Sequence, residues 1–354
     1  MKLSTLKRQI KDRMAHILLS LLETEAVGVH LRKEFARYGR IRAGLPYYAN
    51  PYSELMDSAE APERQPIFIS GRFRSGSTLL WNIFRQLDDH TAFYEPFNER
   101  RWFDVSSRGG HTDNTHRGVS DYWAEYDGLQ ELRHYYREDW IRKQLYMDDL
   151  SFDHDMKRYI DCLIEKAPSR PVLQFNRVDF RLPWLRENYP HATLIHVYRN
   201  PRDQWCSVLR NPEDYPPTAQ SPEGFPDRFY LRVWYRDLVA RFPFLQHFEN
   251  RHQYYLFYLI WKLSYCFGRH YSHTSVSMEA LTREPQLTVR QLLKVAGSAF
   301  DESAIDLSFV EPSETRWHNY ASAGWFESIE NECDEWLKDF FQSREWYEEN
   351  RSGI

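Results

Sequence analysis

The sequence has 354 residues, of which 42% are hydrophobic, and a formal net charge of -5 at pH 7. This length can bury a sizeable core, either as one large α/β domain or as a domain with substantial insertions. The charge balance lacks the global basic signature of non-specific nucleic-acid binding. We therefore expect no nucleic-acid partner, and any anion site must be built locally.

The first 60 residues are expected to form a helical extension. Basic and apolar residues between positions 2 and 21 recur at the spacing of an amphipathic helix. The apolar run at 16–22 is too short and too interrupted to cross a bilayer, and no small-residue cleavage site follows it. We expect no transmembrane segment, and the helix packs on the body, on a partner or on a membrane surface.

Between about residues 62 and 300, short β-rich runs alternate with helical stretches. This pattern predicts an α/β fold of the P-loop type, with a parallel sheet flanked by helices. In chain order we expect a strand at 66–70, helices at 76–87 and 156–167, a strand at 172–175, a helix at 182–188, a strand at 192–198, helices at 201–209, 229–248 and 253–271, a strand at 274–278 and a helix at 285–295.

The α/β domain is expected to cover residues 61–310, and a C-terminal loop and helix at 311–354 are expected to close on it. Two stretches break the alternation: residues 97–155 are rich in aromatic and charged residues, and residues 211–227 hold five prolines. Both are predicted to be insertions over the edge of the sheet where open α/β folds bind substrates, with 97–155 on the acceptor side.

Four cysteines stand far apart in the sequence, at Cys162, Cys206, Cys266 and Cys333. They lack the paired spacing that a zinc site requires, so we expect reduced thiols and no metal site. Their scarcity fits a reducing compartment, and we expect a cytoplasmic location.

A glycine-containing segment joins the expected strand at 66–70 to the following helix. It reads Gly71-Arg72-Phe73-Arg74-Ser75-Gly76-Ser77-Thr78, and its two glycines are spaced as in the nucleotide motif G-x-x-x-x-G-K-[ST]. Backbone N–H groups of such a turn converge on an oxyanion together with the positive end of the helix. The segment therefore predicts a phosphate-binding loop.

Two departures from the triphosphate pattern indicate a different nucleotide. Ser77 stands where a nucleotide triphosphatase places its phosphate-binding lysine. The strand at 192–198 is followed by Arg199, whereas a metal-binding acid is expected at that place. Pro201 then opens a helix on which Ser207 lies about two turns in, and it can face the same pocket as Arg199. These features predict a nucleotide with two separated phosphate groups that is bound without a metal.

These residues resemble the family of sulfotransferases that depend on 3′-phosphoadenosine-5′-phosphosulfate (PAPS), over about residues 66–300. Residues 74–78 match the family's phosphosulfate motif [K/R]-S-G-[T/S]-[T/S]. Arg199 and Ser207 match its 3′-phosphate motif, R-[D/N]-P-R with a serine eight residues after the first arginine. Residues 277–285 look like R-Y-E-D-L-x-x-x-P, with departures at Ser277, Met278 and Ala280. The resemblance implies PAPS as cosubstrate and adenosine 3′,5′-bisphosphate as product.

The resemblance also implies roles for individual residues. Ser75, Gly76, Ser77 and Thr78 would hold the 5′-phosphosulfate, and Arg72 and Phe73 belong to the same cofactor-binding loop. Arg74 would neutralise the charge that develops on the bridging oxygen. Transfer to an alcohol also needs a base, and Glu95 is the candidate. Its Tyr-Glu-Pro context and its spacing from Arg74 look like the carbohydrate sulfotransferases, and tyrosylprotein sulfotransferases share the spacing; the alternative is a helix-start or salt-bridge glutamate.

Further candidates lie outside these motifs. Arg177 follows the strand at 172–175 and is either part of the anion site or a surface ion pair. Residues 316–320 are either a loop that closes over the nucleotide, with Trp317, His318 and Tyr320, or an ordinary surface loop. His318 is a lesser hypothesis for the base.

The acceptor is expected to be a hydroxyl-bearing glycan, with a tyrosyl peptide or a small alcohol as alternatives. Aromatic residues of the 97–155 segment either stack on sugar faces or pack with one another: Trp102, Tyr122, Trp123, Tyr126, Tyr135, Tyr136 and Trp140. A P-loop nucleotide kinase and a non-catalytic nucleotide-binding protein are the alternatives of a different class. The missing lysine and the missing metal-binding acid argue against the kinase.

Overall fold

The computed structural model describes residues 65–209, 211–298, 305–312 and 315–342. All of them belong to one compact unit that spans Ala61–Ile354. The helical extension predicted at residues 1–60, including its amphipathic helix, lies outside the described residues.

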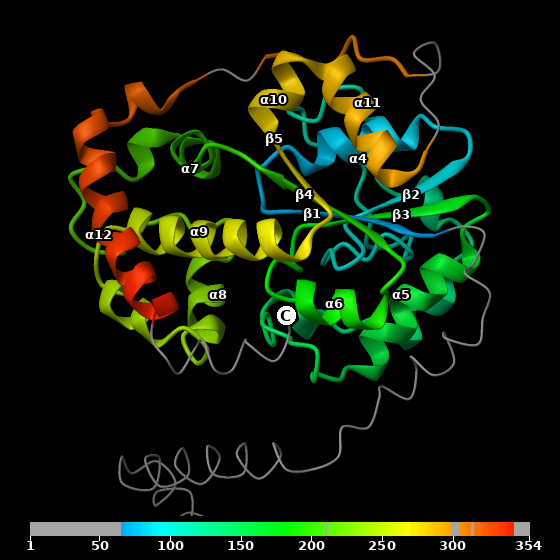
Figure 1. Cartoon of the computed structure of the whole chain (residues 1–354), viewed down its shortest axis with the longest axis horizontal. Helices are drawn as coiled ribbons and strands as arrows, with labels where there is room; N and C mark the ends of the chain where they lie inside the picture. The colour runs from blue at the N-terminus through cyan, green and yellow to red at the C-terminus, as the bar shows by residue number, and fades with distance from the viewer. Residues whose placement is uncertain (1–64, 210, 299–304, 313–314, 343–354) are drawn as a thin grey trace, which may run out of the picture. The chain divides into compact units, whose positions relative to one another are not determined.

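A five-stranded parallel sheet forms the centre of this unit, in the order β2-β3-β1-β4-β5 (Figure 1). The residues of the four strands β1 to β4 are nearly all buried, because helices cover both faces of the sheet, whereas the edge strand β5 is mostly half-buried. The predicted α/β fold with a parallel sheet is confirmed. The strands are β1 (Ile67–Gly71), β2 (His90–Tyr94), β3 (Arg170–Phe175), β4 (Thr193–Tyr198) and β5 (Thr274–Ser277).

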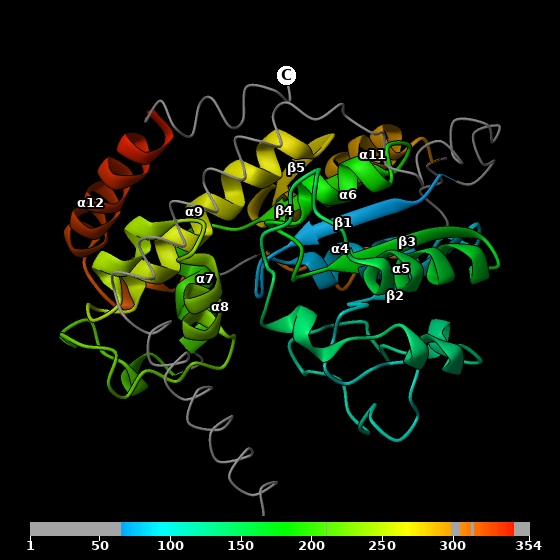
Figure 2. The same cartoon turned by 90° about the horizontal axis from the view of Figure 1, so that it is seen from below.

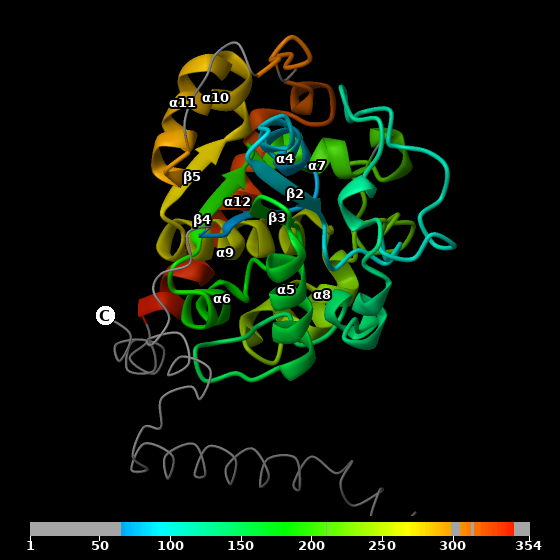
Figure 3. The same cartoon turned by 90° about the vertical axis from the view of Figure 1, so that its right-hand side faces the viewer.

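Helices cover the sheet in two layers (Figures 1 and 3). One face carries α4 (Ser77–Arg85), α10 (Met278–Arg283) and α11 (Pro285–Ala296). The opposite face carries α5 (His154–Lys166), α6 (Leu182–Asn188) and α9 (Tyr254–Tyr271). Beyond the carboxyl ends of the strands stand α7 (Pro201–Leu209), α8 (Leu231–Leu238) and α12 (Ala323–Gln342), as Figure 2 shows. The site residues described below come from this end of the sheet.

Short 3₁₀ turns occur in the irregular segments between these elements. Three of them lie in the segment between β2 and α5, which forms an irregular lobe beside the sheet (teal in Figure 2). Among the described residues, no helix is both long enough and apolar enough to span a bilayer. The 3₁₀ turns cover Ala124–Tyr126, Gln130–His134, Glu138–Ile141, Pro212–Asp214, Pro243–Phe248 and Trp317–Asn319.

The structure corrects the sequence-based elements at three places. The single helix expected at 229–248 ends at Leu238 and is followed by a 3₁₀ turn that begins at Pro243. Proline has no N–H to continue an α-helical ladder, which explains the break. Strand β2 and helix α10 were not expected, and β2 matters most because Glu95 follows it directly.

Candidate active site

The predicted phosphate loop is a tight turn between β1 and α4. Arg74 and Gly76 both adopt the left-handed backbone conformation, with φ of 66° and 94°. The N–H of Ser75 donates to the carbonyl of Arg72 at 3.1 Å and closes the turn. A turn of this kind, followed by the first N–H groups of a helix, forms a concave site that favours an anion.

Gly76 is required for steric as well as conformational reasons. A side chain is strained at its φ, and a Cβ added there would lie 2.9 Å from Cγ of Met278. Met278 begins α10 directly after β5. Residues 277–285, which resemble the family's R-Y-E-D-L-x-x-x-P motif with three departures, therefore pack against the second glycine of the loop through Met278.

Side chains from three other elements brace this loop. Gln204 of α7 donates from Nε2 to the carbonyl of Phe73 at 2.6 Å. Gln174 of β3 donates from Nε2 to Oγ of Ser77 at 3.1 Å. The hydroxyls of Thr78 and of Tyr94, at the end of β2, lie 3.1 Å apart. The loop is thus preorganised, so a ligand need not order it.

The two predicted phosphate motifs meet directly. Arg74 donates from Nε to Oγ of Ser207 at 2.9 Å, across a separation of 133 positions in the sequence. Ser207 is partly exposed on α7, two turns after Pro201. The helix start that the sequence predicted is therefore correct, and it turns Ser207 toward the loop.

Arg199 joins the same cluster at the end of β4. Burial lowers the pKa of its guanidinium, Asp203 and Glu279 oppose this, and the charges of Arg74 and Arg316 lower the pKa further. Arg74 and Arg316, from separate parts of the chain, therefore both lie within electrostatic range of Arg199. Positive charge gathered in this way favours an anionic ligand, although Asp113 also lies 3.7 Å from Arg74.

Glu95 lies beyond the end of β2, next to the residue that contacts the loop. Its backbone φ is 38°, and the residue is 8% exposed. Its carboxylate accepts hydrogen bonds from Asn98 Nδ2 at 2.5 Å, from Arg177 Nη1 at 3.1 Å and from Asn176 Nδ2. The Arg177 guanidinium that donates to this carboxylate lies 5.0 Å from the centre of the Phe73 ring, so Glu95 is linked to the phosphate loop through Arg177.

A model of the family described as "Sulfotransferase family" matches residues 66–302, about two thirds of the chain. The chain belongs to the sulfotransferase family. The matched range includes the phosphate loop, Glu95, Arg199 and Ser207. No curated protein matches the chain.

Solved structures with a similar fold are distant in sequence. Sulfotransferase STF9 from Mycobacterium avium is 14% identical with a TM-score of 0.41, over 82% of this chain and 81% of that chain. The sulfotransferase domain of the Synechococcus olefin synthase is 17% identical with a TM-score of 0.34, over 79% and 91%. A mouse sulfotransferase complexed with PAP is 11% identical with a TM-score of 0.37, over 85% and 94%. Since these TM-scores lie below 0.5, the family assignment rests on the family model.

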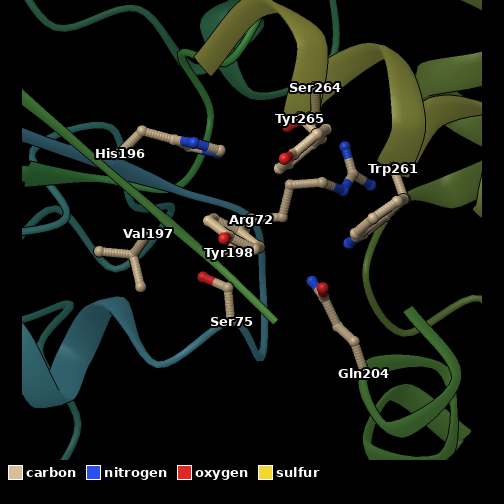
Figure 4. Close-up of a pocket in the computed structure, with 9 residues that line it drawn as sticks. All are labelled: Arg72, Ser75, His196, Val197, Tyr198, Gln204, Trp261, Ser264 and Tyr265. Carbon is tan, nitrogen blue, oxygen red and sulfur yellow. The ribbon is translucent and has the colours of Figure 1, made fainter. Parts of the chain in front are cut away.

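In this sulfotransferase the side chain of Arg72 points into the protein. Its Nη1 donates to Asp179 at 3.4 Å, and its guanidinium lies over the Trp234 ring at 5.1 Å. Burial lowers the pKa of Arg72 and raises that of Asp179, and each charge opposes the effect on the other. Figure 4 shows Arg72 and Ser75 beside a small internal cavity that Gln204 also lines. Arg72 thus anchors the loop to the protein interior through Asp179 and Trp234.

Arg177 forms a buried ion pair and not the surface ion pair that was one of its two interpretations. Its guanidinium pairs with two carboxylates. The residue is 3% exposed, directly follows Asn176 beyond β3, and pairs with both Glu95 and Glu99. Its guanidinium also lies 5.0 Å from the centre of the Phe73 ring. Arg177 therefore belongs to the surroundings of Glu95.

The loop at 315–320 packs on the first turn of α7. The backbone N–H groups of Arg316 and Trp317 donate to Oδ1 of Asp203 at 2.7 and 3.3 Å. Tyr320 is buried and donates its hydroxyl to the carbonyl of Tyr215 at 2.8 Å, whereas His318 is exposed. The sequence reading missed Asp203; an acid in the first turn of a helix was its only signal.

His116 is a second residue that the sequence reading missed. Its Nδ1 lies 2.6 Å from the hydroxyl of Tyr122, and burial lowers the pKa of the imidazole to about 4, opposed by Asp113 and reinforced by Arg74. The ring is therefore neutral near pH 7 and lies close to the loop arginine. Thr115, its neighbour, accepts from Nη1 of Arg74 at 3.0 Å. A neutral imidazole here is a second candidate for the base, and no local pattern in the sequence indicated it.

The aromatic residues of the segment between β2 and α5 pack with one another. Tyr94 stacks on Tyr122 with ring centroids 4.5 Å apart, and Trp140 packs edge-on against Tyr159 at 5.7 Å. Trp123 and Tyr135 are partly buried and pack against the same core. Of the two interpretations, the one in which the segment buries its own aromatics is correct. The remaining predicted sugar-stacking residues are all buried: Trp102, Tyr122, Tyr126, Tyr136 and Trp140.

Within the described ranges, no group of three or more His, Cys, Asp or Glu side chains could hold a metal ion. The four cysteines are free thiols, of which Cys162, Cys206 and Cys333 are buried.

Proposed function

We propose that this sulfotransferase moves a sulfuryl group from PAPS to a hydroxyl of a carbohydrate acceptor and releases adenosine 3′,5′-bisphosphate. Residues 75–78 would hold the 5′-phosphosulfate, and Arg199 with Ser207 would hold the 3′-phosphate. Arg74 would stabilise the leaving group, and Glu95 would accept the acceptor's proton.

The observation that carries this proposal is the hydrogen bond between Arg74 and Ser207, 2.9 Å long. It brings the 5′ motif and the 3′ motif to one site at the carboxyl end of the sheet, where open α/β folds bind ligands. A nucleotide with phosphate groups at both ends of its ribose can engage both motifs at once. A simple triphosphate has no group for the second motif.

The residues supply what the transfer needs. The acceptor oxygen forms a bond to sulfur as its proton passes to Glu95. The bond from sulfur to the bridging oxygen breaks, and its electron pair remains on the 5′-phosphate of the departing bisphosphate. In this proposal the Arg74 guanidinium would lie beside that growing negative charge, and fixed charges of this kind supply much of the rate enhancement in enzymes.

The proposed carbohydrate acceptor is supported by the Tyr94-Glu95-Pro96 context. The spacing from Arg74 to Glu95 also resembles that of carbohydrate sulfotransferases, but tyrosylprotein sulfotransferases share it. The aromatic residues of the 97–155 segment give it no support, since they pack among themselves. The proposal also includes a cytoplasmic location, which the scattered free cysteines support. It includes a reaction without metal, because Arg199 stands at the end of β4 where a metal-binding acid would be expected.

Calorimetry separates this function from its alternatives. We expect adenosine 3′,5′-bisphosphate to bind in the presence of EDTA at least ten times more tightly than ATP with Mg²⁺, because two arginine-bearing motifs replace the P-loop lysine and its metal. Tighter binding of Mg·ATP would contradict the proposal and indicate a kinase. Binding of the bisphosphate without its release from PAPS, with any acceptor, would indicate a binding protein.

The acceptor class can be identified with ³⁵S-labelled PAPS. A panel of methyl glycosides, one tyrosyl peptide and small primary alcohols is incubated with the enzyme, and the products are separated. We expect label in the glycosides, because the residues around Glu95 resemble those of carbohydrate sulfotransferases. Label confined to the peptide or to the alcohols would overturn the carbohydrate assignment and leave sulfuryl transfer intact.

A further inference from the structure

One guanidinium joins two carboxylates beyond the carboxyl end of β3. Arg177 donates from Nη1 to Glu95 at 3.1 Å and from Nη2 to Glu99 at 2.6 Å. The side chains of Arg177, Glu95 and Glu99 are 2%, 10% and 41% exposed. A buried cation is thus shared between an enclosed carboxylate and one that reaches solvent.

Further contacts fix the orientation of this guanidinium. Its Nη1 also donates to Oδ1 of Asn176 at 2.5 Å, and the amide of Asn176 donates back to Glu95. On the far side, Glu99 accepts from the hydroxyl of Tyr230 at 3.0 Å. The two carboxylates and the guanidinium therefore have little freedom to rotate independently.

We propose that Arg177 and Glu99 are positioning residues that set the orientation and the proton-accepting strength of Glu95. This inference rests on the role proposed above for Glu95. Neither residue needs to touch the nucleotide, and both act through the carboxylate that takes the acceptor's proton.

The charge count explains why two carboxylates share one arginine. A buried arginine paired with Glu95 alone would hold that carboxylate in its ionised form and make it a reluctant proton acceptor. When Glu95 takes the proton, such an arginine would also be left as an uncompensated buried charge, which is costly. Glu99 offsets both effects, because it draws on the same guanidinium and keeps it paired after the proton has moved.

The phenols and the amides that contact Glu95 or interact electrostatically with it are uncharged at working pH. The phenols of Tyr94, Tyr122 and Tyr126 interact electrostatically with it, but burial raises the pKa of each, so they stay neutral at working pH. Asn98 and Asn176, which donate to Glu95, carry no charge. A change of charge at Glu99 should therefore reach Glu95 through Arg177.

The test measures how kcat/KM for the best acceptor of the panel, or for water attacking PAPS, depends on pH. In Glu99→Gln we expect the acid limb to move to lower pH and kcat on the plateau to fall about three- to tenfold, because a weaker base transfers the proton less readily. Glu332→Gln is the matched control: Glu332 also accepts from one arginine and one tyrosine, Arg251 and Tyr255, and its side chain is 39% exposed. The control should keep the wild-type profile.

Arg177→Lys separates positioning from nucleotide binding. Lysine keeps the charge but has no planar fork for two carboxylates, so we expect kcat to fall at least about tenfold, with the Kd of adenosine 3′,5′-bisphosphate within about twofold of wild type. An unshifted acid limb in Glu99→Gln, or a Kd raised tenfold in Arg177→Lys, would overturn the inference. If the wild-type enzyme releases no bisphosphate from PAPS, the proposed function fails instead, which keeps the two failures distinct.

Discussion

Replacing Arg74 with methionine is expected to lower kcat about 10²- to 10³-fold, the usual cost of removing one preorganised donor from a site of developing negative charge. The side chain is held for this role: its Nε bonds to Ser207 and its Nη1 to Thr115, so the guanidinium is oriented before PAPS binds. Methionine preserves length and apolar volume but supplies no charge. Single-turnover release of bisphosphate from saturating PAPS measures the effect.

Two further variants identify the cause of that loss. Arg74→Lys restores the charge and should recover activity to within about tenfold of wild type, since the family motif accepts either cation. Ser207→Ala removes the partner of Arg74 and the contact proposed for the 3′-phosphate, so it should raise KM for PAPS more than it lowers kcat. If Ser207→Ala lowered kcat as much as Arg74→Met does, the hydrogen bond between Arg74 and Ser207, and not the charge of Arg74, would be the cause of the loss.

The second large effect is expected at Glu95. Glu95→Gln keeps the shape of the side chain but cannot accept a proton, so kcat should fall at least about a hundredfold. Binding of adenosine 3′,5′-bisphosphate should stay unchanged, because Arg199 and Ser207 are untouched. Turnover and calorimetry on the same preparation give both quantities.

His116→Asn is the comparison for this experiment. Asparagine retains a hydrogen-bonding side chain but cannot serve as a base at neutral pH. If Glu95 is the base, His116→Asn should lose much less activity than Glu95→Gln. Near-normal turnover of Glu95→Gln together with a hundredfold loss in His116→Asn would transfer the role to the imidazole.

Elements with local signals were predictable from the sequence. The helices expected at 182–188 and 201–209 have the observed bounds of α6 and α7, and Pro201 at the first position of α7 is such a local signal. The phosphate loop was predictable for the same reason, since the glycine spacing and the flanking elements are contiguous. The left-handed φ of Arg74 was not, because a non-glycine residue seldom adopts it.

Partners that lie far apart in the sequence were beyond prediction. Arg72 was expected in the cofactor-binding loop, and Arg177 either in the anion site or in a surface ion pair. Each is paired in the structure to an acid that no local pattern connects to it. The same holds for His116, whose low pKa arises from burial within an irregular segment. The aromatic segment had the right composition for sugar binding, but composition does not reveal which faces are buried.

Helix α12 is attached to α7, and this attachment limits how far the C-terminal part of the enzyme can be shortened. Arg202 of α7 forms a bidentate ion pair with Glu330 at 2.7 and 2.9 Å, and its guanidinium lies over the Trp317 ring at 4.8 Å. Both partners lie after residue 302, where the family match ends. A truncated enzyme trimmed to that boundary would lose the tether of the helix that carries Ser207. The part of the structure that holds α7 in place therefore extends beyond the region that the family model matches, and it includes α12.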